Sequence, residues 1–388
     1  MEWKEFQISE IATLINGRAY SQDELFEKGK YKIVRVGNLS GGNKWFFSDM
    51  ELDADKYCYP NDLLFSWACN FGPHIWKNDK TIYHYHIWKV KEDSSKIDKY
   101  FFYYFLKYRT PYWLGNVNGS VMVHITKGTM EKQSIRIPVN LSDQRKIAGI
   151  LSALDAKIEN NNKINANLEA QAEALFKSWF VDFTPFKDQP FVDSELGPIP
   201  QGWKVGKLGD IALQSTEKVL IRNDVKVLSP ITTGKLVLSE EYFTKQVFSK
   251  SIRNYKIVKQ GAFAYNPARV NIGSLGMNEF KFDGCVSPVY VVFECLKGYS
   301  FFFDLFRKTE FFKQAVISFA IGGVRQTLNY SDFALIDATI PPLNIVQSFN
   351  EIYLHLKKKI SINEEENQRL VALRDTLLPK LMSGEIKL

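Results

Sequence analysis

The 388-residue chain contains two copies of one sequence pattern, and this internal repeat constrains its fold more than any other feature. Four segments return in the same order, offset by 199 to 203 residues. The matching segments are 3–12 with 203–212, 61–66 with 260–265, 119–125 with 322–328, and 137–138 with 340–341. Each match is weak alone, but a nearly constant offset in one order predicts two copies of one structural unit.

Each copy ends in a long segment with helical periodicity. Positions spaced alternately by four and three residues run from Ile147 to Trp179, and the same positions shifted by 202 run from Phe349 to Leu381. This spacing places them on one helix face, and a sustained seam of this kind is typical of a coiled coil. The central seam positions that we expect in the helix pair are Leu154, Ile158, Asn161, Asn165, Leu168, Leu356, Ile360, Asn363, Asn367 and Leu370.

Asparagines interrupt both seams at the same depth, with Asn161 and Asn165 in the first and Asn363 and Asn367 in the second. Polar seam residues weaken a coiled coil but fix its register, because a misaligned partner leaves the amides unpaired. We therefore expect the two helices to pair with each other, and antiparallel pairing is the simplest arrangement for two related repeats. The alternative is that each helix packs only on its own domain.

Cap and turn residues mark the boundaries of these helices. Ser142 supplies a cap for the first long helix, and a segment rich in Gly and Pro at 197–202 follows that helix. Pro379 is expected to break the second helix near its end. The expected parts are a globular domain at 1–141, a central helix at 142–183, a linker at 184–202, a second globular domain at 203–342 and a C-terminal helix at 343–388.

Both globular parts mix strand-like and helical segments. Residues 82–88 and 286–293 are strand-like, whereas residues 100–108 and 301–316 have helical patterns. The predicted fold class is therefore α+β. We expect two related globular domains, joined by two long antiparallel coiled-coil helices in a pseudo-two-fold internal repeat.

Composition narrows the function only slightly. A net charge of +7 permits DNA binding, but many proteins without nucleic-acid partners share such a surplus. The four cysteines form no Cys-x-x-Cys pair, and no apolar run reaches the length that spans a bilayer. The first residues carry acidic groups and no apolar run, which argues against a secretory signal, so we expect a cytoplasmic protein.

No recognisable catalytic constellation is present in the sequence. The best match to the Asn/Asp-Pro-Pro-aromatic box of DNA methyltransferases, at 265–268, lacks the second proline and the aromatic residue. Residues 273–276 lack the lysine and hydroxyl of a phosphate-binding loop. His84 and His86 share one face of an expected strand, but no further ligand lies at metal-binding spacing. We therefore expect neither a catalytic residue nor a metal site.

Three stretches carry a resemblance to a known family. They are Leu-Phe-Lys-Ser-Trp-Phe-Val-Asp-Phe at 175–183, Gly-Pro-Ile-Pro-Gln-Gly-Trp at 197–203, and Leu-Arg-Asp-Thr-Leu-Leu-Pro-Lys-Leu-Met-Ser-Gly-Glu-Ile at 373–386. Together with the duplicated Trp-Lys openings, they make the chain similar to the DNA-specificity (S) subunits of Type I restriction–modification systems. The resemblance covers essentially the whole chain.

The resemblance implies a DNA-binding subunit without catalysis of its own. Two target-recognition domains would each read one half of a split site in double-stranded DNA, held at a fixed distance by the helices. The same helices would recruit two methyltransferase (M) subunits, which carry S-adenosylmethionine, and restriction/translocase (R) subunits, which use ATP and Mg. The chain itself would hold no cofactor.

Loop residues of both domains are the candidates for DNA contact, because variable loops on a shared scaffold are the usual place for binding residues. Arg suits guanine, and Asn or Gln suits adenine. The candidates are Arg18, Tyr20, Trp67, Asn70, Asn118, Ser120, Tyr265, Asn266, Arg269, Asn271, Arg325 and Gln326. For each of them, a structural turn or a phosphate contact is the alternative to base reading. For the chain, the alternatives are a fused enzyme or a helical scaffold without DNA contact.

Overall fold

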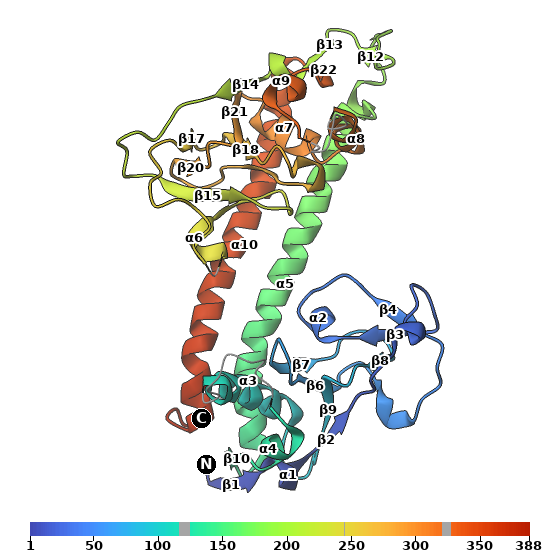
Figure 1. The fold of residues 1–388 in the computed structure, drawn as a ribbon, viewed down its shortest axis with the longest axis vertical. Helices are drawn as coiled ribbons and strands as arrows, with labels where there is room; N and C mark the ends of the chain where they lie inside the picture. The colour runs from blue at the N-terminus through green and yellow to red at the C-terminus, as the bar shows by residue number, and fades with distance from the viewer. Residues whose placement is uncertain (116–124, 244, 320–326) are drawn as a thin grey trace. The chain divides into compact units, whose positions relative to one another are not determined.

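The structure is a computed structural model that describes residues 1–115, 125–243, 245–319 and 327–388 (Figure 1). The chain forms two compact units. Unit 1 contains Met1–Asn162 and Asn363–Leu388, and unit 2 contains Lys163–Ile362. Each long helix therefore contributes one part to each unit.

Unit 1 contains three small sheets. The first has the order β2 (Ala12–Asn16), β9 (Ile87–Glu92), β6 (Leu63–Ser66), β7 (Gly72–Ile75). The second has the order β4 (Phe46–Ser48), β3 (Tyr31–Val34), β8 (Thr81–Tyr83), β5 (Tyr57–Cys58). The third pairs β1 (Trp3–Gln7) with β10 (Ser134–Pro138), antiparallel. Short helices α1 (Ile8–Ile11), α2 (Val36–Leu39) and α4 (Lys127–Glu131) connect the strands.

Unit 2 repeats this topology strand for strand. Its first sheet has the order β14 (Ala212–Ser215), β21 (Val291–Cys295), β18 (Phe263–Tyr265), β19 (Leu275–Met277). Its second has the order β16 (Leu236–Leu238), β15 (Lys226–Pro230), β20 (Gly284–Val286), β17 (Lys256–Val258). β13 (Lys204–Lys207) pairs with β22 (Asp337–Ile340), and the short helices are α6 (Ser239–Tyr242) and α9 (Tyr330–Phe333). Both second sheets contain one parallel pair, β3–β8 and β15–β20, so the predicted internal repeat is confirmed.

The turn before β6 and β18 corrects the predicted match of 61–66 with 260–265 by one residue, because Asn61 occupies the same place as Gly261. Asn61 and Gly261 precede β6 and β18 with φ angles of +74° and +79°. The backbone N–H of Asn61 donates to the carbonyl of Trp76 at 2.7 Å, and that of Gly261 donates to Asn278 at 2.8 Å. Gly and Asn are the residues that adopt this left-handed conformation most readily. The backbone geometry is thus shared although the residues differ.

Two predicted strands are each divided by a turn. Residues 82–88 form the end of β8, a turn at 84–86 and the start of β9. Residues 286–293 are likewise split between β20 and β21 by a turn at 287–290. The apolar pattern continues through both turns because their flanking residues are buried in different sheets, which periodicity alone does not distinguish. His84 and His86 therefore lie in a turn and not on one strand face.

The predicted helices inside the domains are present, with different bounds. Residues 100–108 lie in α3 (Lys99–Gly115), whereas 301–316 are divided between α7 (Ser300–Phe306) and α8 (Glu310–Phe319). Phe101 and Phe102 of α3 are fully buried in unit 1, and Phe302 and Phe303 of α7 are equally buried in unit 2. Equivalent aromatic side chains thus form the centre of each core.

The two long helices are α5 (Leu141–Phe180) and α10 (Leu343–Ser383). Asn140, and not Ser142, caps α5, because its Oδ1 accepts a hydrogen bond from the backbone N–H of Ser142 at 2.7 Å. The prediction that Pro379 breaks the second helix was wrong, since α10 continues to Ser383. A proline one turn from the C-terminus of a helix removes only one hydrogen bond there.

The long helices pair antiparallel in both units. In unit 1, Asp155 of α5 contacts Arg374 of α10, and Asn161 contacts Asn367. In unit 2, Asn165 donates to the carbonyl of Ile360, and Phe176 packs against Phe349. Within each unit the α10 partner number falls as the α5 number rises, so the helices run in opposite directions.

The segment between α5 and β13 packs on unit 2. Its strands β11 (Phe191–Val192) and β12 (Ile199–Pro200) form a small antiparallel hairpin. Phe186 and Ile199 are buried in the core of unit 2, where the ring of Trp203 contacts that of Phe180 of α5. This packing fixes the C-terminal end of α5 against the core of unit 2.

Candidate nucleic-acid interface

Sheet topology brings three loops of each unit to one edge. In unit 1, β2 and β6 both run antiparallel to β9, which lies between them. Asn16 at the end of β2 is paired with Trp88, and Ser66 at the end of β6 is paired with Ile87. The segments that follow β2 and β6 therefore leave the sheet at the same edge as the turn that precedes β9. We call residues 17–20, 67–71 and 84–86 edge 1.

The same register holds in unit 2. Ser215 at the end of β14 is paired with Val292, and Tyr265 at the end of β18 is paired with Val291. We call residues 216–218, 266–274 and 287–290 edge 2. Of the candidate DNA-binding residues that the structure describes, all but Tyr265 lie within these two edges, and Tyr265 ends β18 at edge 2.

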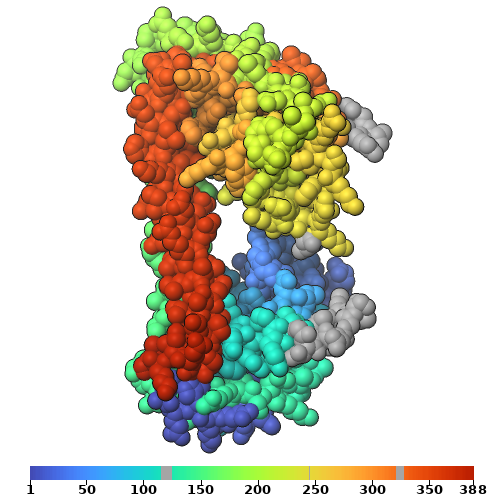
Figure 2. Space-filling view, turned by 90° about the vertical axis from the view of Figure 1, so that its left-hand side faces the viewer, coloured from blue at the N-terminus to red at the C-terminus, as the bar shows by residue number. Residues whose placement is uncertain are grey.

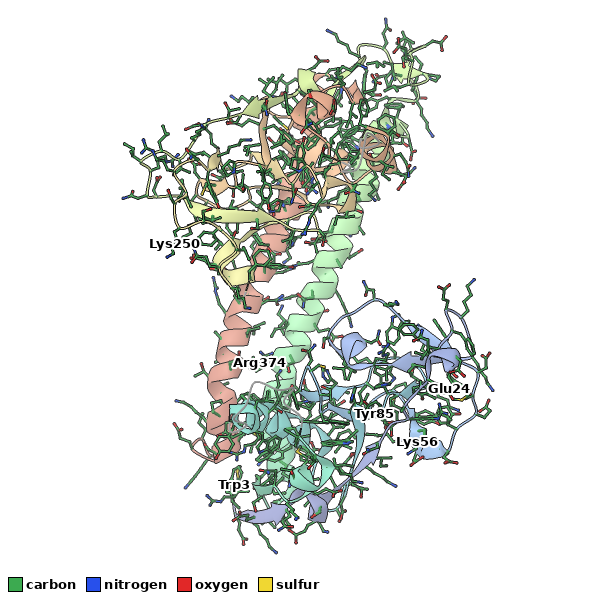
Figure 3. The ribbon with its side chains drawn as sticks, in the orientation of Figure 1. Trp3, Glu24, Lys56, Tyr85, Lys250 and Arg374 are labelled. Atoms are coloured by element: carbon green, nitrogen blue, oxygen red, sulfur yellow. The ribbon has the colours of Figure 1, made fainter. Side chains whose placement is uncertain are left out.

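Trp67 is the central ring of edge 1. Its backbone N–H donates to the carbonyl of His86 at 3.1 Å, and its indole Nε1 donates to the carbonyl of Tyr85 at 2.9 Å. The ring lies edge-on to His86, with centroids 5.0 Å apart, and stacks on Trp88 at 5.8 Å. These contacts hold the turn at 84–86 rigidly, with the ring of Tyr85 exposed (Figure 3).

Arg18 and Tyr20 reach the same turn from the other side. The backbone N–H of Arg18 donates to the carbonyl of Tyr83 at 3.1 Å, and its carbonyl accepts from the N–H of Tyr85 at 2.9 Å. The Arg18 guanidinium lies 5.2 Å from the Tyr20 ring and donates two hydrogen bonds to Glu24, of 2.6 and 2.9 Å. These bonds lower the pKa of Glu24 to about 2. The ion pair thus engages two of the five N–H donors of Arg18.

Two neutral histidines complete edge 1. Burial lowers the pKa of His84 to about 4, with the nearby His86 and Arg35 adding to the shift. Burial and Arg35 also lower the pKa of His86. Both imidazoles are therefore uncharged at pH 7, and Nδ1 of His84 accepts a hydrogen bond from the backbone N–H of His86 at 3.5 Å.

Asn70 lies further along the loop after β6. Its side chain is exposed, and its Nδ2 donates to the Ser40 hydroxyl at 2.6 Å. This bond ties the loop to the end of α2 and leaves the amide at the surface. Asn118 and Ser120 lie outside the described residues.

Edge 2 is built on a tight loop between β18 and β19. The N–H of Asn266 donates to the carbonyl of Ser274 at 3.1 Å, and its Oδ1 accepts from the N–H of Ala268 at 3.0 Å. The carbonyl of Arg269 accepts from Ser274 at 3.1 Å. The Arg269 side chain is exposed, and no ion pair of its guanidinium is found among the described residues. The backbone is thus fixed while the charged group reaches outward.

Asn271 is exposed on the same loop, two residues after Arg269. Tyr265 differs from its neighbours, because it is fully buried and its ring packs against Phe293 and Phe333. From this position it does not reach the surface, so we assign it to the core and not to a DNA contact. Arg325 and Gln326 lie outside the described residues.

Two asparagines of the helix seam are joined by a hydrogen bond in unit 1. Asn161 is fully buried, and its Nδ2 donates to Glu366 at 2.7 Å and to Asn367 at 3.0 Å. Lys157 donates to Oδ1 of Asn161 at 3.1 Å. Asn363 is also buried. The remaining seam positions are buried or half-buried on the helix pair: Leu154, Ile158, Asn165, Leu168, Leu356, Ile360 and Leu370.

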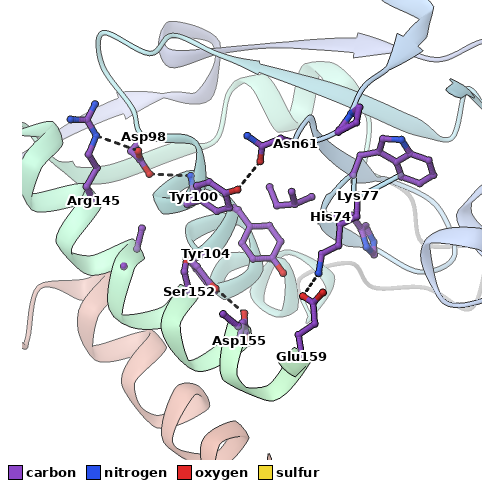
Figure 4. A pocket seen from close by; sticks show the side chains of 17 residues that line it. Asn61, His74, Lys77, Asp98, Tyr100, Tyr104, Arg145, Ser152, Asp155 and Glu159 are labelled. Carbon is purple, nitrogen blue, oxygen red and sulfur yellow. Dashed lines mark hydrogen bonds and ion pairs between the residues drawn. The ribbon is translucent and has the colours of Figure 1, made fainter. Parts of the chain in front are cut away.

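An open cavity of about 860 Å³ separates part of the unit 1 sheets from α5 (Figure 4). Tyr104 of α3 donates to Asp155 of α5 at 2.8 Å, and Asp155 also pairs with Arg374 of α10 at 2.7 Å. Asp98 at the start of α3 lies 3.6 Å from Arg145 of α5. The charged groups around the cavity are thus paired with one another, and they anchor the domain to the helices.

The described residues contain neither a cluster of metal ligands nor a helix that could span a membrane. No group of three or more His, Cys, Asp or Glu side chains there is arranged to hold a metal ion. No helix in the same ranges is long and apolar enough to cross a membrane.

The turns at 84–86 and 287–290 lie where the sequence pattern predicted strands. Pro288 was a usable signal, because proline lacks the N–H that a central strand requires. Residues 84–86 offered no comparable signal. Their aromatic and imidazole side chains fit a strand equally well.

Comparison with known proteins gave consistent matches. Residues 1–170 match the family model of the Type I restriction modification DNA specificity domain. The specificity subunit of the Type I restriction enzyme MjaIX from Methanocaldococcus jannaschii is 29% identical over 308 residues, covering 75% of this chain and 69% of that protein. The EcoBI specificity subunit from Escherichia coli is 20% identical, with 99% and 86% covered. The crystal structure of a Type I restriction–modification S subunit from M. genitalium has a TM-score of 0.58 at 16% identity, with 98% and 96% covered.

Proposed function

We propose that this chain, a DNA specificity subunit of the Type I restriction–modification family, reads its DNA site in two halves, one with each unit. The family match confirms the resemblance predicted from the sequence. The main observation behind this proposal is that edge 1 and edge 2 occupy equivalent positions in the two units. The same strand register projects equivalent loops from both units.

The side chains at these edges suit direct contact with DNA. Arg269 and Asn271 are exposed on a fixed loop, and they offer the donors and acceptors that base edges require. Edge 1 offers an exposed tyrosine and neutral imidazoles. Because the two sets differ, we expect the two half-sites to differ in sequence.

The long helices provide a surface for partner subunits. Ile352 and Leu354 of α10 are 42% and 47% exposed in unit 2, and Leu373 is 48% exposed in unit 1. Apolar side chains that recur along the outside of a helix pair favour protein–protein contact. We propose that two methyltransferase subunits dock there and that restriction subunits join this core in the cytoplasm. S-adenosylmethionine, ATP and Mg would be held by those partners, and this chain would perform no catalysis.

The helix pair also suits a spacer. A helix of 40 residues is ~60 Å long at ~1.5 Å per residue. Two readers joined by one stiff element bind cooperatively when both reach their half-sites. We propose that the helices set the length of the unread gap between the half-sites.

Methylome sequencing tests this proposal directly. The chain is expressed with its methyltransferase subunit in cells that lack other adenine methylation. We expect methylated adenines in a motif of two specified half-sites separated by a gap of fixed length. A continuous motif, or methylation unrelated to sequence, would contradict the proposal. The purified chain alone should transfer no methyl groups.

A further inference from the structure

An apolar turn projects from unit 2 between β14 and β15. Val219 is buried, but Leu220 and Ile221 are 55% and 93% exposed. Leu220 also has a φ of +52°, a left-handed conformation that a branched side chain adopts only at an energetic cost. Strained residues of this kind are found mainly at functional sites. Ile221, at 93% exposure, likewise buries almost no apolar surface and so contributes little to the stability of the fold.

Hydrogen bonds hold this turn in place. The N–H of Val219 donates to the carbonyl of Tyr255, and the N–H of Leu220 donates to that of Arg253, both at 2.9 Å. The N–H of Arg222 closes the turn on the carbonyl of Val219, also at 2.9 Å. The Arg222 guanidinium is bound to Asp224 and Asp283. The apolar tip is therefore presented on a fixed backbone.

The segment that supports the turn is basic. Residues 245–253 contain Lys245, Lys250 and Arg253 but no acidic residue. All three side chains are exposed, and none has an ion pair within the part of the chain that the structure describes. Figure 2 shows this yellow segment next to the lime segment that contains the turn, on one face of unit 2. Unpaired cations around an apolar tip favour a polyanion as the partner.

The whole connection between β16 and β17 also contains Glu240 and Glu241 before these three cations, whereas the equivalent connection of unit 1 is strongly acidic. Between β4 and β5, residues 49–56 contain Asp49, Glu51, Asp53 and Asp55 against the single cation Lys56. A connection of that composition repels phosphate groups. The basic character is therefore specific to unit 2 and is not required by the shared fold.

We propose that the turn at 219–222 is a DNA contact of unit 2, in which Ile221 touches a thymine methyl group in the major groove. Lys250 and Arg253 bind the adjacent phosphates and place the turn. Apolar side chains recognise the C5-methyl of thymine in this groove. This inference rests on the proposed function and adds a contact that lies outside edge 2.

The test uses the assembled complex with its methyltransferase subunits. After the wild-type motif is known, Ile221→Ser is compared with Leu335→Ser, which changes an exposed leucine elsewhere in unit 2. We expect I221S to relax one thymine position of one half-site and to weaken binding to the original site about tenfold. L335S should change neither.

A second arm tests the methyl contact. Replacing that thymine by deoxyuridine should weaken wild-type binding several-fold and leave I221S binding unchanged. R253A should weaken binding to all sequences and lower the slope of log K against log salt by about 0.9. If the wild type bends the DNA and its binding does not change with deoxyuridine, Ile221 acts as a wedge in the minor groove. This result would overturn the thymine contact.

The outcomes separate this inference from the proposed function. An unchanged motif and affinity in I221S, together with a changed motif in R269A, would overturn the inference alone. A wild-type motif that is not bipartite would overturn the proposed function and the inference with it.

Discussion

Edge 1 and edge 2 lie at the ends of equivalent strands but are stabilised by different contacts. In edge 1, Trp67 packs on the turn at 84–86, and Arg18 is held by Glu24. In edge 2, backbone hydrogen bonds fix the loop, and Arg269 reaches into solvent. The shared strand register thus places the loops, while the side chains on those loops can differ without disturbing the core.

The anchors between each domain and the helix pair differ as well. In unit 1, Asp155 of α5 is shared by Tyr104 and Arg374 and is partly exposed. In unit 2, the almost fully buried Asp304 of α7 pairs with Arg307 at 2.6 Å and accepts from Tyr353 of α10 at 3.2 Å. Arg307 also lowers the pKa of Asp304, against the effect of burial. Removing one residue from the more deeply buried network should therefore cost more unfolding free energy.

The largest effect is therefore expected from Asp304→Ala. This change leaves Arg307 buried without its carboxylate, and we expect unit 2 to lose about 3–5 kcal/mol of unfolding free energy. Asp155→Ala should cost unit 1 less, about 1–3 kcal/mol, because Arg374 keeps a contact with Asp375. Urea unfolding of both variants measures the difference. Equal losses would show that burial does not distinguish the two anchors.

Arg269→Ala is expected to weaken specific binding by about 1–3 kcal/mol and to relax one position of one half-site. The guanidinium is free to meet guanine, whereas Arg18 is engaged by Glu24. Arg18→Ala should therefore affect the stability of edge 1 more than the motif. If R269A weakens all sequences alike, Arg269 contacts phosphate, and the comparison between the two arginines fails.

Tyr85→Ala should change the other half-site. We expect a loss of about 1 kcal/mol in binding, with the half-site read by unit 2 unaltered. Tyr85→Phe serves as the control, because it keeps the ring. Methylome sequencing of both variants gives the result, and a change in both half-sites would contradict independent reading by the two units.

The smallest effect concerns pH. The folded pKa of His84, about 4, lies below the ordinary value of 6.5, so the unfolded chain binds the proton first as pH falls. Stability from the neutral imidazole is present above pH 6.5 and is lost between pH 6.5 and 4. His84→Phe should reduce the fall in Tm over this range, which thermal unfolding of both proteins between pH 6.5 and 4 measures. An identical fall in both proteins would show that His84 is not responsible.

The repeat, the α+β class and the antiparallel helices could be predicted because they depend on patterns that extend over many residues. The turn at 84–86 could not, since a short apolar run looks the same whether it is one strand or two, whereas Pro288 was a signal for the turn at 287–290. The burial of Tyr265 was missed for a similar reason. A residue at the end of a strand faces the core or the solvent according to register, which the neighbouring Asn266 and Arg269 do not reveal.

The boundary between the units offers the most direct test of the account. Four residues are inserted between Asn162 and Lys163 and four between Ile362 and Asn363, so that each unit keeps its own helix contacts. Each insertion adds ~6 Å of helix at ~1.5 Å per residue. Methylome sequencing of an assembled complex should then give both original half-sites, with the gap longer by up to about two base pairs of ~3.4 Å. An active complex that keeps the original gap would show that the helices do not set the distance between the two readers.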